Sequence, residues 1–216
     1  MSDAGEPLAR IAAALERLST PRVAEPDWGA APAYVWDGNA RAVAAISAPA
    51  LALLRGIDPQ KALVSANIER LAAGHAAHDM LLWGARGMGK SALLRSCVAA
   101  AQLLDPARIA LVQVGPEALP SLPALFAALA RESRRFVVYI DDLGFEDGDS
   151  EGPRRLRSWL EGGVDARPGN VRLAVTSNRR AIVSRHLAEQ DDPINQRSDG
   201  CHVQARNDED ARDGRE

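Results

Sequence analysis

Short apolar segments alternate with helix-like segments between residues 79 and 188, and this alternation is the main structural signal in the chain. The apolar runs at 80–83, 109–114, 136–140 and 171–176 are predicted strands, and residues 90–104, 122–132 and 154–161 are predicted helices. Strands that are apolar along their whole length are typical of a sheet that is buried on both faces. The pattern therefore predicts an α/β fold in which helices cover both faces of a parallel sheet.

The regions on either side of this alternation have a different composition. Residues 1–50 are rich in alanine, with helical spacing of apolar residues at 8, 11, 15 and 18 followed by several prolines, and another helix is predicted over residues 61–73. Residues 189–216 are polar and hold few bulky aliphatic side chains. Such a segment buries too little surface to offset its ordering entropy. We therefore divide the chain into an N-terminal helical or irregular region (1–50), a core (51–188) and a disordered tail (189–216).

Charge and composition exclude several classes of protein. The net charge is −3, which gives no basic field for binding nucleic acid or an anionic membrane. The longest nearly apolar run is the 13 residues between Arg41 and Arg55, whereas a membrane-spanning helix needs ~20 residues. The acidic N-terminus does not resemble a secretory signal, and two cysteines cannot form a disulfide framework. These features predict a soluble cytoplasmic protein with no membrane association.

A glycine-rich segment fits the phosphate-binding pattern G-x-x-x-x-G-K-S/T. It follows the predicted strand 80–83 and opens the predicted helix 90–104. Backbone N–H groups of such a loop and the N-terminus of the next helix bind phosphate. Lys90 would reach the β- and γ-phosphates, and the Ser91 hydroxyl would ligate Mg²⁺. The segment reads Gly84-Ala85-Arg86-Gly87-Met88-Gly89-Lys90-Ser91.

Polar residues follow the next apolar strands. Asp141 and Asp142 come directly after the strand 136–140, and Asn178 follows the strand 171–176. Asp141 is predicted to hold Mg²⁺ and Asp142 to activate the attacking water, while Asn178 is placed to hold that water or touch the γ-phosphate. Taken alone, the acidic pair would favour a strand that ends in a solvated acidic turn, and Thr-Ser-Asn would be an ordinary turn. Their order after the phosphate loop favours a catalytic site that uses ATP and Mg²⁺.

These three elements, in this order, resemble Walker A, Walker B and sensor 1 of the AAA+ division of P-loop ATPases. Further segments are similar to a bacterial family of AAA+ ATPases known as domain of unknown function 815, and the similarity covers about residues 33–186. The resemblance implies an ATP-binding αβα core with strand order 5-1-4-3-2. It also implies that Gly56 and Ile57 lie near the adenine. The similar segments are 54–58, 82–91, 141–149, 160–168 and 176–180.

The resemblance ends near His186. Members of the family continue after residues 176–180 into a fifth strand and a small helical lid, and here a polar tail follows instead. We therefore expect the fifth strand and the lid to be missing. The strand 80–83 would then lie at an exposed edge of the sheet, and the chain, as a truncated member, would bind nucleotide but hydrolyse it poorly.

Three functions remain open. The leading interpretation is a Mg²⁺-dependent ATPase of the AAA+ type that acts on an unknown protein partner, and the resemblance implies assembly into a homo-oligomer. The second is a nucleotide-binding protein with little or no turnover, and the third is a P-loop kinase for a small molecule. A GTPase is disfavoured because the chain has no Asn-Lys-x-Asp segment. Nucleic-acid binding is disfavoured because positive net charge and stacking aromatic positions are lacking.

Overall fold

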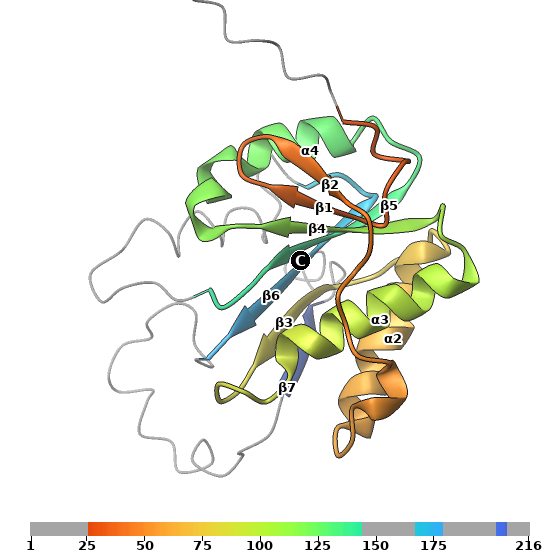
Figure 1. Cartoon of the computed structure of the whole chain (residues 1–216), viewed down its shortest axis with the longest axis vertical. Coiled ribbons are helices and arrows are strands. Elements are labelled where there is room, and N and C mark those ends of the chain that lie inside the picture. Colours follow the sequence, from red (N-terminus) through yellow and green to blue (C-terminus); the bar gives the residue numbers. More distant parts are fainter. Residues whose placement is uncertain (1–25, 144–166, 179–201, 207–216) are drawn as a thin grey trace, which may run out of the picture.

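A seven-stranded sheet forms the centre of the structure, a computed structural model that describes residues 26–143, 167–178 and the backbone of 202–206 (Figure 1). The strand order is β2-β1-β4-β5-β6-β3-β7. The strands are β1 (Ala33–Trp36), β2 (Ala40–Val43), β3 (Asp79–Trp83), β4 (Ile109–Val114), β5 (Arg135–Ile140), β6 (Val171–Ser177) and β7 (His202–Arg206).

The middle of this sheet is parallel, as the sequence predicts. Strand β4 pairs with β5, β5 with β6 and β6 with β3, all in parallel. The expected order 5-1-4-3-2 counts strands from the one before the glycine-rich loop, which is β3. In that count β3-β6-β5-β4 is the expected order 1-4-3-2. The carboxyl ends of these four strands therefore lie at one edge of the sheet, where ligands of open α/β sheets bind.

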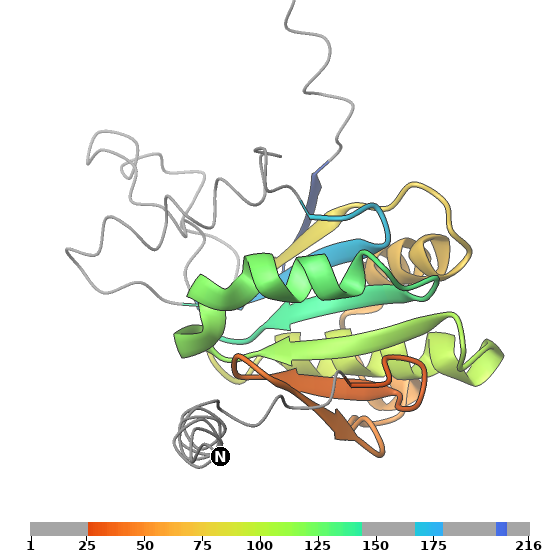
Figure 2. The same cartoon turned by 90° about the horizontal axis from the view of Figure 1, so that it is seen from above.

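Helices cover both faces of the sheet (Figure 2). Helices α2 (Asp58–Ala72) and α3 (Lys90–Leu104) pack on one face, with Ile68 and Leu94 fully buried in their cluster. Helix α4 (Leu122–Leu129) packs on the other face. Two short 3₁₀ turns, η1 (Leu51–Leu53) and η2 (Pro116–Ser121), precede α2 and α4. This arrangement confirms the α/β fold with helices on both faces.

The structure extends the sheet on the side of β4 beyond the predicted core. Strand β1 pairs in parallel with β4, and β2 turns back antiparallel beside β1. Residues 33–43 therefore belong to the same sheet as the core, and the predicted boundary at residue 50 does not separate them. A strand of four residues is too short for its periodicity to stand out from a proline-rich context.

The other side of the sheet differs from the sequence prediction. Strand β7 pairs antiparallel with β3, with Asp79 opposite Arg206 and Trp83 opposite His202. The expectation that β3 lies at an open edge is therefore wrong, and so is the predicted disorder of residues 202–206. Pairing through the backbone does not require apolar side chains. The segment does alternate polar residues with Val203 and Ala205, which is the period of a strand.

Several predicted elements lie outside the described residues. These are the helix-like segment at 8–18, the helix 154–161 and most of the polar tail. None of the described helices has the length and apolar character needed to cross a membrane.

Candidate functional site

The glycine-rich loop connects β3 to α3 at the carboxyl edge of the sheet (Figure 1). Gly87 and Gly89 have φ angles of 83° and 79°, in the left-handed region that other residues rarely adopt. A Cβ atom at either position would meet no atom within 4 Å. The requirement for glycine is thus conformational, since these φ angles turn the loop into the first turn of α3. That turn begins with the hydrogen bond from Leu93 N to Gly89 O at 2.8 Å.

Lys90 is held inside this loop. Its side-chain nitrogen donates to the carbonyl oxygens of Gly84 at 2.8 Å and Ala85 at 2.9 Å, and to Oδ1 of Asn178 at 3.1 Å. The residue is only 7% exposed. A buried ammonium group at the start of a helix, between the loop and the end of β6, supplies positive charge where a phosphate chain would lie.

Ser91 and Thr176 bind the same carboxylate oxygen. The Ser91 hydroxyl donates to Oδ1 of Asp141 at 2.6 Å, and the Thr176 hydroxyl donates to that oxygen at 2.7 Å. The three side chains come from α3, from the end of β6 and from the residue after β5. Two converging donors fix the orientation of the carboxylate at the edge of the sheet.

Asp142 has a left-handed backbone conformation, with a φ angle of 49°. Among the described residues it is the one residue other than glycine with a positive φ. Its N–H donates to the hydroxyl of Thr176 at 2.8 Å. Its carboxylate accepts a hydrogen bond from Nδ2 of Asn178 at 2.5 Å. Asn178 therefore connects Asp142 to Lys90.

The electrostatic setting favours an ionised Asp141. Burial by itself raises the pKa of this carboxyl, but the hydroxyl groups of Ser91, Tyr139 and Thr176 and the charge of Arg95 together outweigh burial and lower the pKa below its usual value. Arg95 also donates from Nε to the carbonyl of Ser91 at 3.2 Å. The hydroxyl of the buried Tyr139 lies near enough to Asp141 for the two pKa values to influence each other, although it makes no regular hydrogen bond in the described part of the chain.

Gly56 and Ile57 lie on the segment that leads into α2. Gly56 has a φ of 76°, and Ile57 packs against the cluster that contains the buried face of α3. The side-chain nitrogen of Lys61 donates to the carbonyl of Leu54 at 2.7 Å and pairs with Asp58 at 2.6 Å, which ties the segment to the first turn of the helix. Of the two predicted adenine-binding residues, Ile57 thus packs on the cluster that α2, α3 and the sheet share, and Gly56 is exposed.

Five of the predicted site residues belong to one hydrogen-bond network in which Thr176 joins the pair Ser91 and Asp141 to the chain Lys90, Asn178 and Asp142. The other residues of the glycine-rich loop form the turn around Lys90. Sequence reasoning missed Thr176, which contacts both aspartates, and Arg95. The available signal for Thr176 was a polar residue that ends an apolar strand, and for Arg95 its place one helical turn after Ser91.

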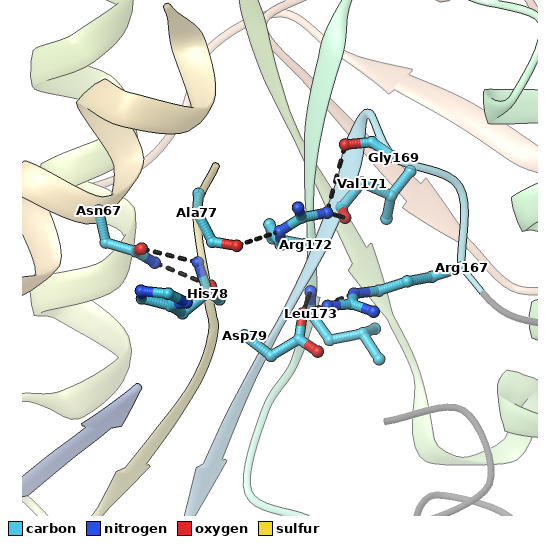
Figure 3. Close-up of polar contacts among 9 residues, drawn as sticks. All are labelled: Asn67, Ala77, His78, Asp79, Arg167, Gly169, Val171, Arg172 and Leu173. Atoms are coloured by element: carbon cyan, nitrogen blue, oxygen red, sulfur yellow. Dashed lines mark hydrogen bonds and ion pairs between the residues drawn. The ribbon is translucent and has the colours of Figure 1, made fainter. Parts of the chain in front are cut away.

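A buried ion pair holds the opposite end of β3 (Figure 3). Oδ1 of Asp79 accepts hydrogen bonds from Nε of Arg167 at 2.9 Å and from the backbone N–H of Leu173 at 2.8 Å. Burial raises the pKa of Asp79, and the charge of Arg167 opposes this rise. The side chain of Asn67 bonds both the N–H and the carbonyl of His78 at 2.8 Å. These contacts fix where β3 begins and hence the position of the glycine-rich loop that follows it.

The sequence matches the model of one protein family, described as Protein of unknown function (DUF815), over residues 29–210. The match continues past residue 186, where the resemblance of the motifs was expected to end, and it includes β7. A comparison with curated proteins finds no match.

Two solved structures are similar to part of the chain. PCH-2 of C. elegans shares 18% identity with a TM-score of 0.43, over 61% of this chain and 40% of that protein. The RuvB Holliday junction branch migration motor of Thermotoga maritima shares 21% identity with a TM-score of 0.38, over 60% of this chain and 41% of that protein. The chain therefore spans less than half the length of either protein.

Proposed function

We propose that this chain, which belongs to the family described as Protein of unknown function (DUF815), has a P-loop core of the AAA+ kind that binds ATP with Mg²⁺ and hydrolyses it. The observation that carries this proposal is the hydrogen-bond network that joins the glycine-rich loop to the ends of β5 and β6. The loop, the acidic strand end and the asparagine are far apart in the sequence, and each supplies a group that phosphoryl transfer requires.

The phosphate-binding part of the proposal rests on the loop and Lys90. The left-handed glycines turn the backbone around the ammonium group, and α3 begins directly after the loop. Lys90 would exchange its bonds to the carbonyls of Gly84 and Ala85 for bonds to phosphate oxygens. The segment with Gly56 and Ile57, which leads into α2, would lie against the adenine.

The residues beside the loop fit Mg²⁺. The hydroxyl of Ser91 and the carboxylate of Asp141 lie 2.6 Å apart, and both are hard oxygen donors of the kind that Mg²⁺ prefers. The lowered pKa keeps Asp141 ionised at neutral pH. Bound Mg²⁺ would neutralise charge on the phosphates, while Ser91 and Asp141 would hold it, either directly or through water.

Asp142 and Asn178 would direct the attacking water. Asn178 is exposed at the end of β6, and its amide donates to the Asp142 carboxylate. In this position Asp142 would accept the proton of the water, and Asn178 would orient the water or contact the γ-phosphate.

We further propose that the chain uses ATP hydrolysis to act on an unidentified protein partner, and that it does so as a homo-oligomer. The net charge of −3 disfavours a nucleic acid as the target. The oligomer rests on the family resemblance, since a catalytic arginine supplied from a neighbour is a general device of phosphoryl transfer.

Calorimetric titration with ATP, with and without Mg²⁺, together with phosphate release from the same sample, tests the proposal. Lys90→Ala should weaken ATP binding about 10- to 100-fold, because it removes charge-assisted hydrogen bonds to the phosphates. Arg108→Ala is the matched control, since it removes a positive charge at an exposed position and should leave binding unchanged. No ATP binding by the unsubstituted chain would overturn the proposal. Binding without phosphate release would support a nucleotide-binding protein, and release that requires an added acceptor would support a kinase.

A further inference from the structure

Thr176 lies at a junction between the strands that carry the proposed site. It is the penultimate residue of β6 and is opposite Leu82 of β3, two residues before Gly84 begins the glycine-rich loop. On its other side β6 pairs with β5, which leads into the two aspartates. The residue is 1% exposed, so its hydroxyl must find its hydrogen-bond partners within the protein.

The hydroxyl of Thr176 has both a donor and an acceptor role. Its proton goes to Oδ1 of Asp141 at 2.7 Å, and its oxygen accepts the N–H of Asp142 at 2.8 Å. The carbonyl of the same residue accepts the N–H of Leu143 at 2.8 Å. One residue therefore holds three consecutive residues of the turn that follows β5.

These bonds act on a turn that has a backbone cost. Asp142 adopts a φ of 49°, which is sterically unfavourable for a residue with a side chain. The hydrogen bond to Thr176 fixes the amide of Asp142 in this conformation. The carboxylate of Asp142 then reaches Asn178, and that of Asp141 reaches Ser91.

We propose that Thr176 is a positioning residue that places both carboxylates, Asp141 for the metal and Asp142 for the attacking water. This inference rests on the proposed function of the same site. Thr176 has no hydrogen bond to the glycine-rich loop among those described, so it should leave nucleotide binding without metal unaffected. Its loss should instead affect the dependence on Mg²⁺ and the rate of hydrolysis.

The test compares Thr176→Val, which keeps the shape and removes the hydroxyl, with Thr176→Ser, which keeps the hydroxyl. We expect Thr176→Val to lower kcat about 100-fold while KM for ATP changes less than about threefold, because small misplacements of catalytic groups have effects of this size. It should also raise, by about tenfold, the Mg²⁺ concentration needed for half-maximal binding of a non-hydrolysable ATP analogue. Thr176→Ser should restore both quantities to within about threefold of the unsubstituted chain.

Amide hydrogen exchange in the unsubstituted chain tests the positioning without any nucleotide. The Asp142 amide should exchange slowly although its residue is exposed, and Thr176→Val should remove this protection while Thr176→Ser retains it. If Thr176→Val does not fold, Thr176→Ala takes its place, and the exchange rate in the unsubstituted chain still decides.

The outcomes separate the two proposals. Absence of ATP binding by the unsubstituted chain overturns the proposed function and the inference with it. ATP binding by the unsubstituted chain, with Thr176→Val matching it in Mg²⁺ dependence and turnover, overturns the inference alone. An Asp142 amide that exchanges as fast as an open one also overturns the inference alone.

Discussion

Oδ1 of Asn178 accepts a hydrogen bond from the ammonium group of Lys90 at 3.1 Å, across 88 residues of sequence. Nδ2 of the same side chain donates to Asp142. The two ends of one amide thus contact the cation proposed to bind phosphate and the carboxylate proposed to activate water. Any movement of Lys90 toward a phosphate would change the partner of Asn178 and so release or shift Asp142.

Asn178→Ala should slow ATP hydrolysis about 10- to 100-fold while ATP affinity changes less than about threefold. The reason is that Lys90 and the loop remain available to bind the phosphates, whereas Asp142 loses its amide partner. Steady-state phosphate release and calorimetry measure the two quantities. Asn39→Ala, at an exposed asparagine between β1 and β2, is the control and should change neither. A loss of affinity as large as the loss of rate would show that Asn178 serves binding instead.

Asp142→Asn should preserve ATP binding and reduce hydrolysis by at least about 100-fold, because the amide cannot accept a proton from water. The change suits this position, since asparagine tolerates the left-handed backbone found at residue 142. The unfolding midpoint in urea should therefore stay close to that of the unsubstituted chain. Asp105→Asn, at a partly exposed aspartate in the turn between α3 and β4, is the control. Hydrolysis that survives in Asp142→Asn would assign the water to another group.

The parallel core of this fold could be predicted from the sequence because its signals are local. Helix α3 and strand β4 have the predicted bounds, Lys90–Leu104 and Ile109–Val114. The apolar strands are buried on both faces, so their side chains need no alternation. The predicted helix 122–132 ends earlier, at Leu129, and residues 130–132 continue as turns.

The edges of the sheet and the inner contacts of the site could not be predicted in the same way. Strands β1 and β7 are four and five residues long, and their place depends on pairing with β4 and β3 far away in the sequence. The sequence identified Asp141 and Asn178 by their positions after strands. It could not show that Thr176 bonds both aspartates, because that contact depends on the register between β5 and β6.

Arg167→Met should lower the free energy of unfolding by about 3–5 kcal/mol near neutral pH, because it leaves the buried carboxylate of Asp79 without its partner. Both side chains of this pair are about one-tenth exposed or less. Urea unfolding measures the change. Arg108→Met removes the arginine of an exposed pair with Asp105 and should have a much smaller effect.

The loss in Arg167→Met should shrink as the pH falls. Burial already raises the pKa of Asp79, and removing Arg167 takes away the largest of the interactions that oppose the rise, so the pKa rises further. The folded variant then binds a proton at a pH where the unfolded chain does not, so its stability increases as the pH falls through the folded pKa. A stability difference between variant and unsubstituted chain that is the same near pH 7 and near pH 5 would contradict this account.

The chain contains two tyrosines, Tyr34 and Tyr139, and neither should ionise near pH 10 while the protein is folded. Burial raises the pKa of both, each being 1% exposed, and the nearby Asp141 raises that of Tyr139 further. Because the folded pKa values exceed the unfolded ones, the stability that the phenols contribute is complete below the unfolded pKa of 10.0 and is lost as the pH rises above it.

Phenolate absorbance recorded against pH should therefore stay flat until the far-ultraviolet circular dichroism begins to change, and then rise in one step. The same titration in concentrated urea should show both groups near their ordinary pKa and serves as the reference. Tyr34→Phe should halve the step, because it leaves one of the two tyrosines. In the folded chain the hydroxyl of Tyr34 donates to the carbonyl of Asp27 at 2.7 Å and accepts the N–H of Ala31 at 3.1 Å. A phenolate signal that appears before unfolding would mean that water reaches one of these hydroxyls. If that signal persisted in Tyr34→Phe, the accessible hydroxyl would be that of Tyr139. Solvent would then reach the side of Asp141 that faces Tyr139 in the proposed metal site.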